Sequence, residues 1–308
     1  MFLPPKLTKN QKLFVFTAFA LSVATLNSCT QEDMTEVPVE SRMKPASNMR
    51  ELTEQLKAYD ARFVRHEEMP VRLPGGVKFN KLDYAKIAIS DVCGGIRGSV
   101  GGVVGAIGGA VSSSLIKACK IYAFKYVKIK LFNKPKKSPI ATFDGNINFS
   151  DSIGFFHNTI EYGLYEENNN SHQLPVSNLI KSTNDRMLAM SPNYRKTGGL
   201  TNSQISYLAT DLERMKNVDI SLSYKDYFGK LKEIYPENAD IIDFCAEYVY
   251  TMLYANVDAD DYTKEVLYML KKSNVDISSR DITYRGIQIA FASIQYSESM
   301  TYTSVNAE

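Results

Sequence analysis

The sequence predicts an all-α protein, a helical bundle with a glycine-zipper helical segment or hairpin. Apolar residues recur at helical spacing along most of the chain after residue 48. Strand patterns are few, and the best of them, residues 126–132, alternates lysine with apolar residues over a short reach. Four glycines, at positions 98, 102, 105 and 109, step by four, three and four residues, the spacing of one helix face.

The first 29 residues are typical of a secretion signal, because three lysines precede an apolar stretch at residues 13–24. Leu26-Asn27-Ser28-Cys29 then resembles the lipobox of bacterial lipoproteins, with leucine three positions before a cysteine and a small residue just before it. The resemblance implies that Cys29 becomes the lipidated first residue of the mature chain. A plain signal peptide or a signal anchor is the alternative reading.

Residues 1–28 are therefore expected to form a lipoprotein signal peptide and residues 29–48 a flexible tether, which is polar and contains two prolines. The acidic pair Glu32-Asp33 is similar to the export tag of Gram-negative lipoproteins on the outer face of the outer membrane. The predicted location is the outer membrane, with a lipid anchor and the protein facing the cell exterior.

Three further segments are predicted after the tether. Residues 49–80 form a first helix, from Met49 to His66, and a linker. A second helical start near Lys81 leads into the glycine-zipper and lysine-rich segment, residues 81–137. Residues 138–308 form an acidic helical domain with apolar stripes at residues 153–164, 205–215, 241–252, 262–269 and 287–294.

The glycine run gives one bare helix face and one branched apolar face. Each glycine disfavours an exposed helix by roughly 0.8 to 1 kcal/mol relative to alanine, so close packing or an apolar surrounding must hold this segment. Residues 98–116 carry no charge and reach the length of about 20 residues that a membrane span needs. Six glycines and four serines make the composition poor for spanning, and a tightly packed helical hairpin is the alternative.

Charge divides the chain unevenly. Residues 70–137 hold 13 Lys and Arg against 2 Asp and Glu, whereas residues 138–308 hold 14 against 23. Lysines interleaved with aromatics favour an anionic surface, and the candidate residues are Lys117, Lys120, Lys125, Lys128 and Lys130. The alternative is that this arm rests on the acidic half of its own chain or of a second copy. No nucleic-acid module is present, and no such partner is expected.

Little in the sequence indicates catalysis. The three histidines lack metal-ligand spacing, so no metal, cofactor or catalytic residue is predicted. His157 is expected to be a structural histidine, and pairing it with Cys245 as nucleophile and base is disfavoured because Cys245 lies in a helical seam. The acidic cluster at residues 258–261 lacks the features of a calcium loop and is interpreted as a helix N-cap.

The sequence Asp-Ser-Ile-Gly-Phe-Phe-His-Asn at residues 151–158, with the glycine run, resembles uncharacterised glycine-zipper, bacteriocin-like surface lipoproteins. Two functions are open. The first is a non-enzymatic binding or scaffold module at the outer membrane, and the second is a membrane-active antibacterial protein that uses the glycine and lysine segments. Expected partners are the membrane through the lipid, and a second membrane contact or a protein through residues 91–137. A homo-oligomer also stays open.

Overall fold

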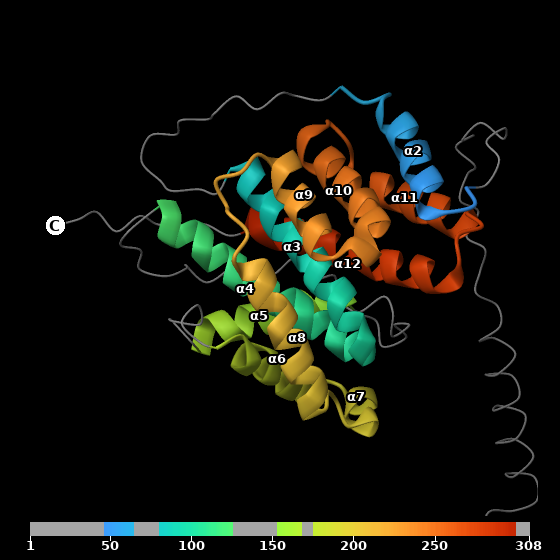
Figure 1. The fold of residues 1–308 in the computed structure, drawn as a ribbon. Helices are drawn as coiled ribbons and strands as arrows, with labels where there is room; N and C mark the ends of the chain where they lie inside the picture. Colours follow the sequence, from blue (N-terminus) through green and yellow to red (C-terminus); the bar gives the residue numbers. More distant parts are fainter. Residues whose placement is uncertain (1–45, 65–79, 126–152, 168–174, 300–308) are drawn as a thin grey trace, which may run out of the picture. The chain divides into compact units, whose positions relative to one another are not determined.

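The computed structural model describes residues 46–64, 80–125, 153–167 and 175–299 (Figure 1). This part of the chain is helical and contains no β-strand, which confirms the predicted all-α class. The segment with the best strand pattern, residues 126–132, lies outside the described residues. The helices are α2 (Met49–Asp60), α3 (Lys81–Gly98), α4 (Gly102–Lys125), α5 (Ile153–Glu167), α6 (Val176–Met190), α7 (Pro192–Thr197), α8 (Asn202–Lys216), α9 (Tyr224–Ile234), α10 (Ala239–Tyr254), α11 (Ala259–Lys272) and α12 (Ile277–Ser299), with short 3-10 turns η1 (Ser99–Gly101) and η3 (Pro236–Asn238).

Helix α3 is the central element, and it packs most extensively against α4, then against α12 and α10. It begins at Lys81, as predicted, because Asn80 and Asp83 form a capping box. The Asn80 side chain accepts a hydrogen bond from the Asp83 backbone N–H at 2.9 Å, and the Asp83 carboxylate accepts one from the Asn80 N–H at 2.8 Å. Most of α3 is buried, so it forms part of the core along its length.

Helices α3 and α4 form an antiparallel hairpin. Gly94 lies against Gly109 and Gly98 against Gly105, so positions that rise along α3 pair with positions that fall along α4. The chain reverses through η1, and Gly102 adopts a φ of 68°, which glycine tolerates without strain. The four predicted glycines therefore do not share one face of one helix. The hairpin, which was the alternative, describes the structure.

The apolar stripes of the C-terminal half lie in α5, α8, α10, α11 and α12, so those five predicted helices are confirmed. Asp258 caps α11, as predicted, by accepting a hydrogen bond from the Asp261 N–H at 2.9 Å. Helices α6, α7 and α9 were not predicted. The first helix ends at Asp60 rather than at His66, because the chain tightens into turns at residues 61–63.

One hydrophobic core joins the described helices, which fall within a unit spanning Pro45–Glu308. The branched residues Ile107, Val111 and Leu115 of α4 are fully buried in it, whereas Val100, predicted to lie on the same face, is 70% exposed at the turn. Within the segment Lys81–Ala118, a window of 18 residues has a mean hydropathy of 1.6, which is apolar enough to cross a membrane, and 72% of that window is buried within the protein. A buried core helix meets the same criteria, so this property is weak evidence for a membrane span.

Helix α2 is fastened to α10 and α11 by buried polar contacts. The Asp60 carboxylate accepts hydrogen bonds from the Thr251 hydroxyl at 2.7 Å and from the Tyr262 hydroxyl at 3.0 Å. Before α2, the carbonyl of Ala46 accepts a hydrogen bond from the Asn274 N–H at 2.7 Å. These contacts attach the first described helix to the C-terminal part of the chain.

Candidate functional site

The glycine residues of the hairpin allow direct contact between two helix backbones. A Cβ atom added to Gly105 would lie 2.1 Å from the Gly98 carbonyl oxygen, and one added to Gly109 would lie 2.0 Å from that of Gly94. No side chain fits at such distances, so a larger residue must force the helices apart. Gly98, Gly105 and Gly109 thus lie in the helix contact. Gly102 lies in the turn, and no heavy atom beyond its neighbours would lie within 4 Å of a Cβ added there.

The two predicted surface lysines that the structure describes point into the protein. The Lys117 side chain is 1% exposed, and its Nζ lies 4.7 Å from the centre of the Tyr227 ring. Burial, with the nearby charges of Lys120 and Lys86, lowers the pKa of Lys117 to about 7. Lys120 donates to the carbonyls of Lys216 at 2.6 Å and Val218 at 3.4 Å. The prediction of an anionic-surface contact is therefore wrong for Lys117, whereas Lys120 is half-buried and uses its ammonium group in these two hydrogen bonds.

The remaining candidate lysines cannot be placed in the same way. Lys125 ends α4, and its side chain lies outside the described part of the protein, as do Lys128, Lys130 and the proposed lipidation site Cys29. Lys86 of α3, which was not a candidate, joins Lys120 in binding the loop after α8 and donates to the Ile220 carbonyl at 2.7 Å. The positive ammonium groups of the two lysines lie near the C-terminal end of α8, which carries a partial negative charge because its last carbonyls lack partners within the helix.

A cluster of buried polar groups lies where α3, α4, α5 and α12 meet, and we call Asp91, Ser114, His157, Glu161 and Ser293 the buried cluster. The Ser293 hydroxyl donates to the Asp91 Oδ2 at 2.6 Å, and the Ser114 hydroxyl donates to the Glu161 Oε1 at 2.7 Å. The His157 ring lies between the carboxyl groups, with Nε2 3.7 Å from Asp91 and Nδ1 3.7 Å from Glu161. Four helices thus bring three titratable side chains together.

Burial decides the protonation of these three groups. It raises the pKa of Asp91 well above its usual value, helped by the neighbouring Glu161, and it raises the pKa of Glu161 to about 8. It also lowers the pKa of His157 to about 4. At neutral pH the Glu161 carboxyl group is therefore mostly protonated and the His157 imidazole is neutral. Within the described residues, Asp91 Oδ1, Glu161 Oε2 and His157 Nε2 have no hydrogen-bond partner.

The buried cluster has little capacity for chemistry on an external substrate, because Asp91, His157 and Glu161 are at most 2% exposed. Among the described residues, no group of three or more His, Cys, Asp or Glu side chains is arranged to hold a metal ion. Cys245 is fully buried in α10, where burial raises the pKa of its thiol and makes the reactive thiolate scarce. The residues placed beside His157 are Asp91, Asn158 and Glu161, and Cys245 is not one of them.

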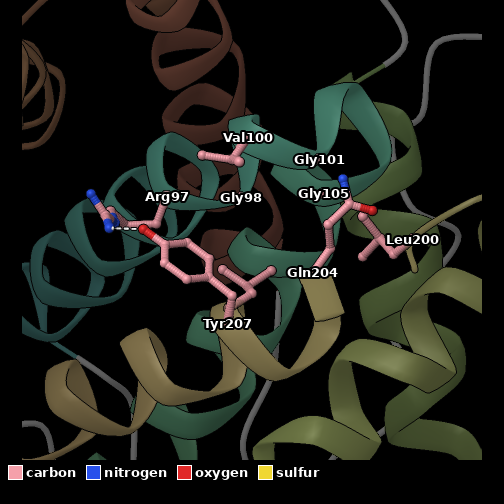
Figure 2. A pocket seen from close by; sticks show the side chains of 9 residues that line it. Arg97, Gly98, Val100, Gly101, Gly105, Leu200, Gln204 and Tyr207 are labelled. Carbon is pink, nitrogen blue, oxygen red and sulfur yellow. Dashed lines mark hydrogen bonds between the residues drawn. The ribbon is translucent and has the colours of Figure 1, made fainter. Parts of the chain in front are cut away.

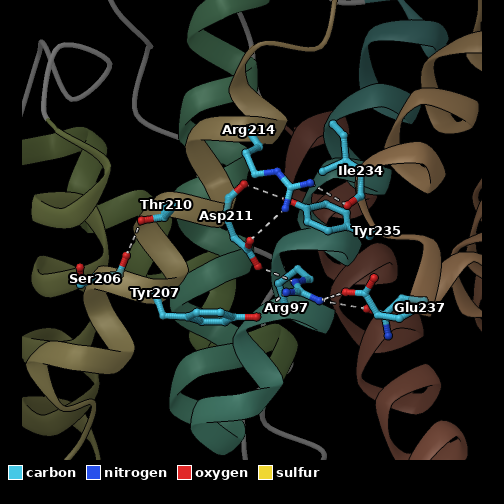
Figure 3. Close-up of polar contacts among 10 residues, drawn as sticks. Arg97, Ser206, Tyr207, Thr210, Asp211, Arg214, Ile234, Tyr235 and Glu237 are labelled. Carbon is cyan, nitrogen blue, oxygen red and sulfur yellow. Dashed lines mark hydrogen bonds and ion pairs between the residues drawn. The ribbon is translucent and has the colours of Figure 1, made fainter.

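A second polar centre surrounds Arg97 at the end of α3, and we call it the Arg97 centre (Figure 3). The guanidinium Nε donates to the Asp211 carboxylate of α8 at 2.6 Å, and its two terminal nitrogens donate to Glu237 and to the Tyr207 hydroxyl. The ring of Tyr235 lies 5.1 Å from the guanidinium carbon, and the Tyr235 hydroxyl donates to the Asp211 carbonyl at 2.9 Å. One arginine therefore joins α3 to α8 and η3.

A small hollow borders the Arg97 centre (Figure 2). Its volume is about 10 Å³, roughly the space of one water molecule, so it has no room for a larger ligand. Its walls come from the end of α3, the turn and α8, and they consist of Arg97, Gly98, Val100, Gly101, Gly105, Leu200, Gln204, Tyr207 and Leu208.

Sequence reasoning found neither the buried cluster nor the Arg97 centre. One available signal was Asp91 itself, an acidic residue close to Ile89 and Val92 in a largely apolar stretch. Its partner Glu161 lies 70 positions later, and helical periodicity cannot indicate which helices pack together. No protein-family model matches the chain, and no curated protein or solved structure matches it either.

Proposed function

We propose that this chain is a lipoprotein of the outer membrane, anchored through Cys29, whose helical body serves as a non-enzymatic binding or scaffold module at the cell surface. The lipobox-like sequence at residues 26–29 supports the anchor. The observation that carries the module role is the backbone contact of Gly98 with Gly105 inside the bundle. Here the glycine run serves helix packing, so it does not need a bilayer to offset its low helix propensity.

Burial of the titratable groups supports the non-enzymatic part of the proposal. The buried cluster and Cys245 are inaccessible from outside, and the hollow beside Arg97 is too small for a substrate. A catalytic site needs groups that reach a bound substrate, within about 3 Å of the proton or atom they act on. The described polar centres instead join helices to one another, which suits a rigid module.

A matched pair of alanine substitutions in α4 tests this role for the glycine hairpin. Gly105→Ala places a methyl group 2.1 Å from a backbone oxygen, so we expect a loss of about 2 kcal/mol or more in the free energy of unfolding. Gly108→Ala places it at 3.7 Å from Leu200, an ordinary contact, and should leave stability equal or raise it by up to about 1 kcal/mol. Urea denaturation of both variants and of the unmodified chain measures the difference.

The same proteins distinguish the membrane-active alternative. If Gly105→Ala is as stable as Gly108→Ala, and the unmodified chain releases dye from anionic vesicles, the module role fails and membrane insertion takes its place. The anchor is tested separately by labelling cells with radioactive palmitate. The unmodified chain should incorporate label and Cys29→Ser should not, and equal labelling would contradict a lipid on Cys29.

A further inference from the structure

Helices α9 and α10 pack side by side (Figure 1). A large surface hollow lies between them. Its volume is about 990 Å³, at the upper end of the range of roughly 300 to 1,000 Å³ found for ligand sites. A second hollow of about 410 Å³, lined by Lys57, Ala61, Phe63 and Glu247, borders it. Lys57 and Glu247 line both, so the two hollows adjoin, and together they are called the groove, which is lined by residues of α9, α10, α2 and the turn after α2.

The floor of the groove is aromatic. Tyr224 stacks on Tyr250 with ring centres 5.9 Å apart and an angle of 21° between the planes, and Phe228 lies 5.3 Å from Tyr224. Phe228 and Tyr250 are half-buried and line the groove. In the second hollow, Phe63 of the turn after α2 is also half-buried. Aromatic side chains therefore line both hollows.

The rim of the groove carries as many positive as negative charges. Four lysines and four carboxylates line the larger hollow, where Lys230 pairs with Glu233 at 2.7 Å and Lys232 with Asp243 at 2.6 Å, while Lys57 pairs with Glu54 of α2 at 2.8 Å. A balanced rim exerts little long-range attraction on a polyanion or a polycation. It does offer donors and acceptors side by side along the groove, which suits a ligand that has both kinds of group and no charge.

We infer that this groove binds an uncharged oligosaccharide. Sugar rings present apolar C–H faces that stack on aromatic side chains, and their hydroxyl groups donate to carboxylates and accept from ammonium groups. Aromatic side chains in both adjoining hollows fit several linked sugar units rather than one. Aromatic-lined grooves also bind proline-rich peptides, but the four lysines and four carboxylates of the larger hollow suit a ligand rich in hydroxyl groups better. This inference names the ligand of the proposed binding role and rests on that role.

Gly229 offers a way to block the groove without disturbing the fold. It lies in the middle of α9 and lines the groove, and a Cβ atom added there would meet no heavy atom within 4 Å. Gly229→Leu should therefore fill the groove, and it also removes a glycine from a helix interior. Phe228→Ala removes part of the aromatic floor. Ser206→Leu, at an exposed position of α8 outside the groove, adds similar bulk as the matched control.

Affinity electrophoresis of the purified full chain tests the inference, with native gels that contain dextran, xyloglucan, glucomannan or starch, and with heparin and polygalacturonate as charged comparisons. We expect at least one neutral polysaccharide to slow the unmodified chain and the Ser206→Leu variant equally. Gly229→Leu and Phe228→Ala should weaken that binding at least tenfold, while their melting curves show that both variants are folded.

Two outcomes overturn the inference: no neutral polysaccharide slows the chain, or Gly229→Leu binds like the unmodified protein. Retardation by the charged polymers alone also contradicts it and indicates binding through lysines. The proposed anchor is tested by palmitate labelling, and the packing role by the Gly105→Ala and Gly108→Ala pair. These tests can therefore support both roles even when no oligosaccharide binds.

Discussion

Asp91 and Arg97 lie six residues apart on α3. The surroundings of Arg97 favour its charged form, whereas those of Asp91 disfavour its charged form. Each nitrogen of the Arg97 guanidinium donates a hydrogen bond, and its acceptor Glu237 is 54% exposed, so water reaches the edge of the centre. Asp91 is fully buried beside Glu161 and His157, and its Oδ1 has no described partner. Arg97, at the end of the helix, therefore remains charged, whereas burial in the middle of the helix disfavours a charge on Asp91.

The difference teaches that burial alone does not decide protonation, because partners of opposite charge can outweigh it. Burial alone would lower the pKa of Arg97, but the hydrogen bond to Asp211 and the negative charges around the guanidinium outweigh that effect. The pKa of Arg97 is therefore raised. Asp91 has a hydroxyl donor and an acidic neighbour, so burial prevails and its pKa rises. The buried cluster should therefore respond to pH in the physiological range, whereas the Arg97 centre should not.

The largest expected effect comes from removing a titrating carboxyl group from the buried cluster. The pKa of Glu161 in the folded state, about 8, exceeds its ordinary value of 4.5, so its contribution to stability is complete below pH 4.5 and is lost as pH rises to 8. We expect Glu161 to account for a loss on the order of 3 kcal/mol between pH 5 and pH 8. Glu161→Gln should remove that part of the slope in urea denaturation at pH 5, 6.5 and 8.

Glu213→Gln, at an exposed position of α8, is the matched control and should keep the slope of the unmodified protein. Equal slopes in the two variants would show that Glu161 does not titrate in this range. His157 sets the acid limit, because its folded pKa of about 4 lies below 6.5. Its contribution is present above pH 6.5 and is lost as pH falls to 4, so Glu161 and His157 together should stabilise the fold most in mildly acidic solution.

The next effect tests the paired charge. Arg97→Ala leaves the Asp211 carboxylate, whose side chain is 8% exposed, with Arg214 at 3.6 Å as its remaining described ion-pair partner. We expect a loss of about 2 kcal/mol, less than for a fully buried pair because Arg214 remains and water reaches Glu237. Thermal and urea denaturation measure it, and the loss should be nearly the same at pH 5 and pH 8.

Arg97→Lys is the informative companion of that variant. A lysine ammonium cannot reproduce the planar fork that reaches Asp211, Glu237 and Tyr207 together, so it should restore less than half of the lost stability. Full restoration would mean that the positive charge matters and the geometry of the guanidinium does not.

The smallest effect concerns Lys117, a buried amino group beside the ring of Tyr227. Its folded pKa of about 7 is below the usual 10.5, so its contribution to stability rises as pH increases from 7 to 10.5. Lys117→Met should raise the free energy of unfolding by about 1 kcal/mol at pH 7, because it removes the cost of burying an amino group. The gain is small because the contact between Lys117 and Tyr227 offsets part of that cost. Urea denaturation at pH 7 and pH 9.5 tests this, and a less stable variant at pH 7 would show that the ring contact prevails.

The sequence predicted those helices whose buried faces are continuous apolar stripes. In α10, Ile241, Cys245 and Tyr248 follow one another at helical spacing, and the structure buries all three. Helix α6 was missed because Thr183 and Asn184 interrupt its buried face, where they serve hydrogen bonds that depend on the fold. Helix α9 is short, and two of its three buried residues are tyrosines.

The glycine segment shows where periodicity stops being informative. A spacing of four, three and four residues fits one helix face, and Gly98 and Gly105 indeed lie in one contact. The spacing could not reveal the turn between them, since a glycine in a turn and a glycine in a helix contact are the same letter. Lys117 and Lys120 were assigned to an anionic surface because they belong to a segment in which lysines alternate with aromatic residues. Only the packing of α4 shows that Lys117 is buried and that the Lys120 ammonium group binds backbone carbonyls.

The attachment of α2 has a mechanical consequence. A pulling force applied to the chain before residue 46 reaches first the bond between Ala46 and Asn274 and then α2, whose C-terminal Asp60 is bound to Thr251 and Tyr262. Since those partners lie near the other end of the chain, tension at the N-terminus is passed directly to α10 and α11 and bypasses the glycine hairpin. If the chain is held at its N-terminus, α2 and the two helices it is bound to bear the load before the glycine hairpin does.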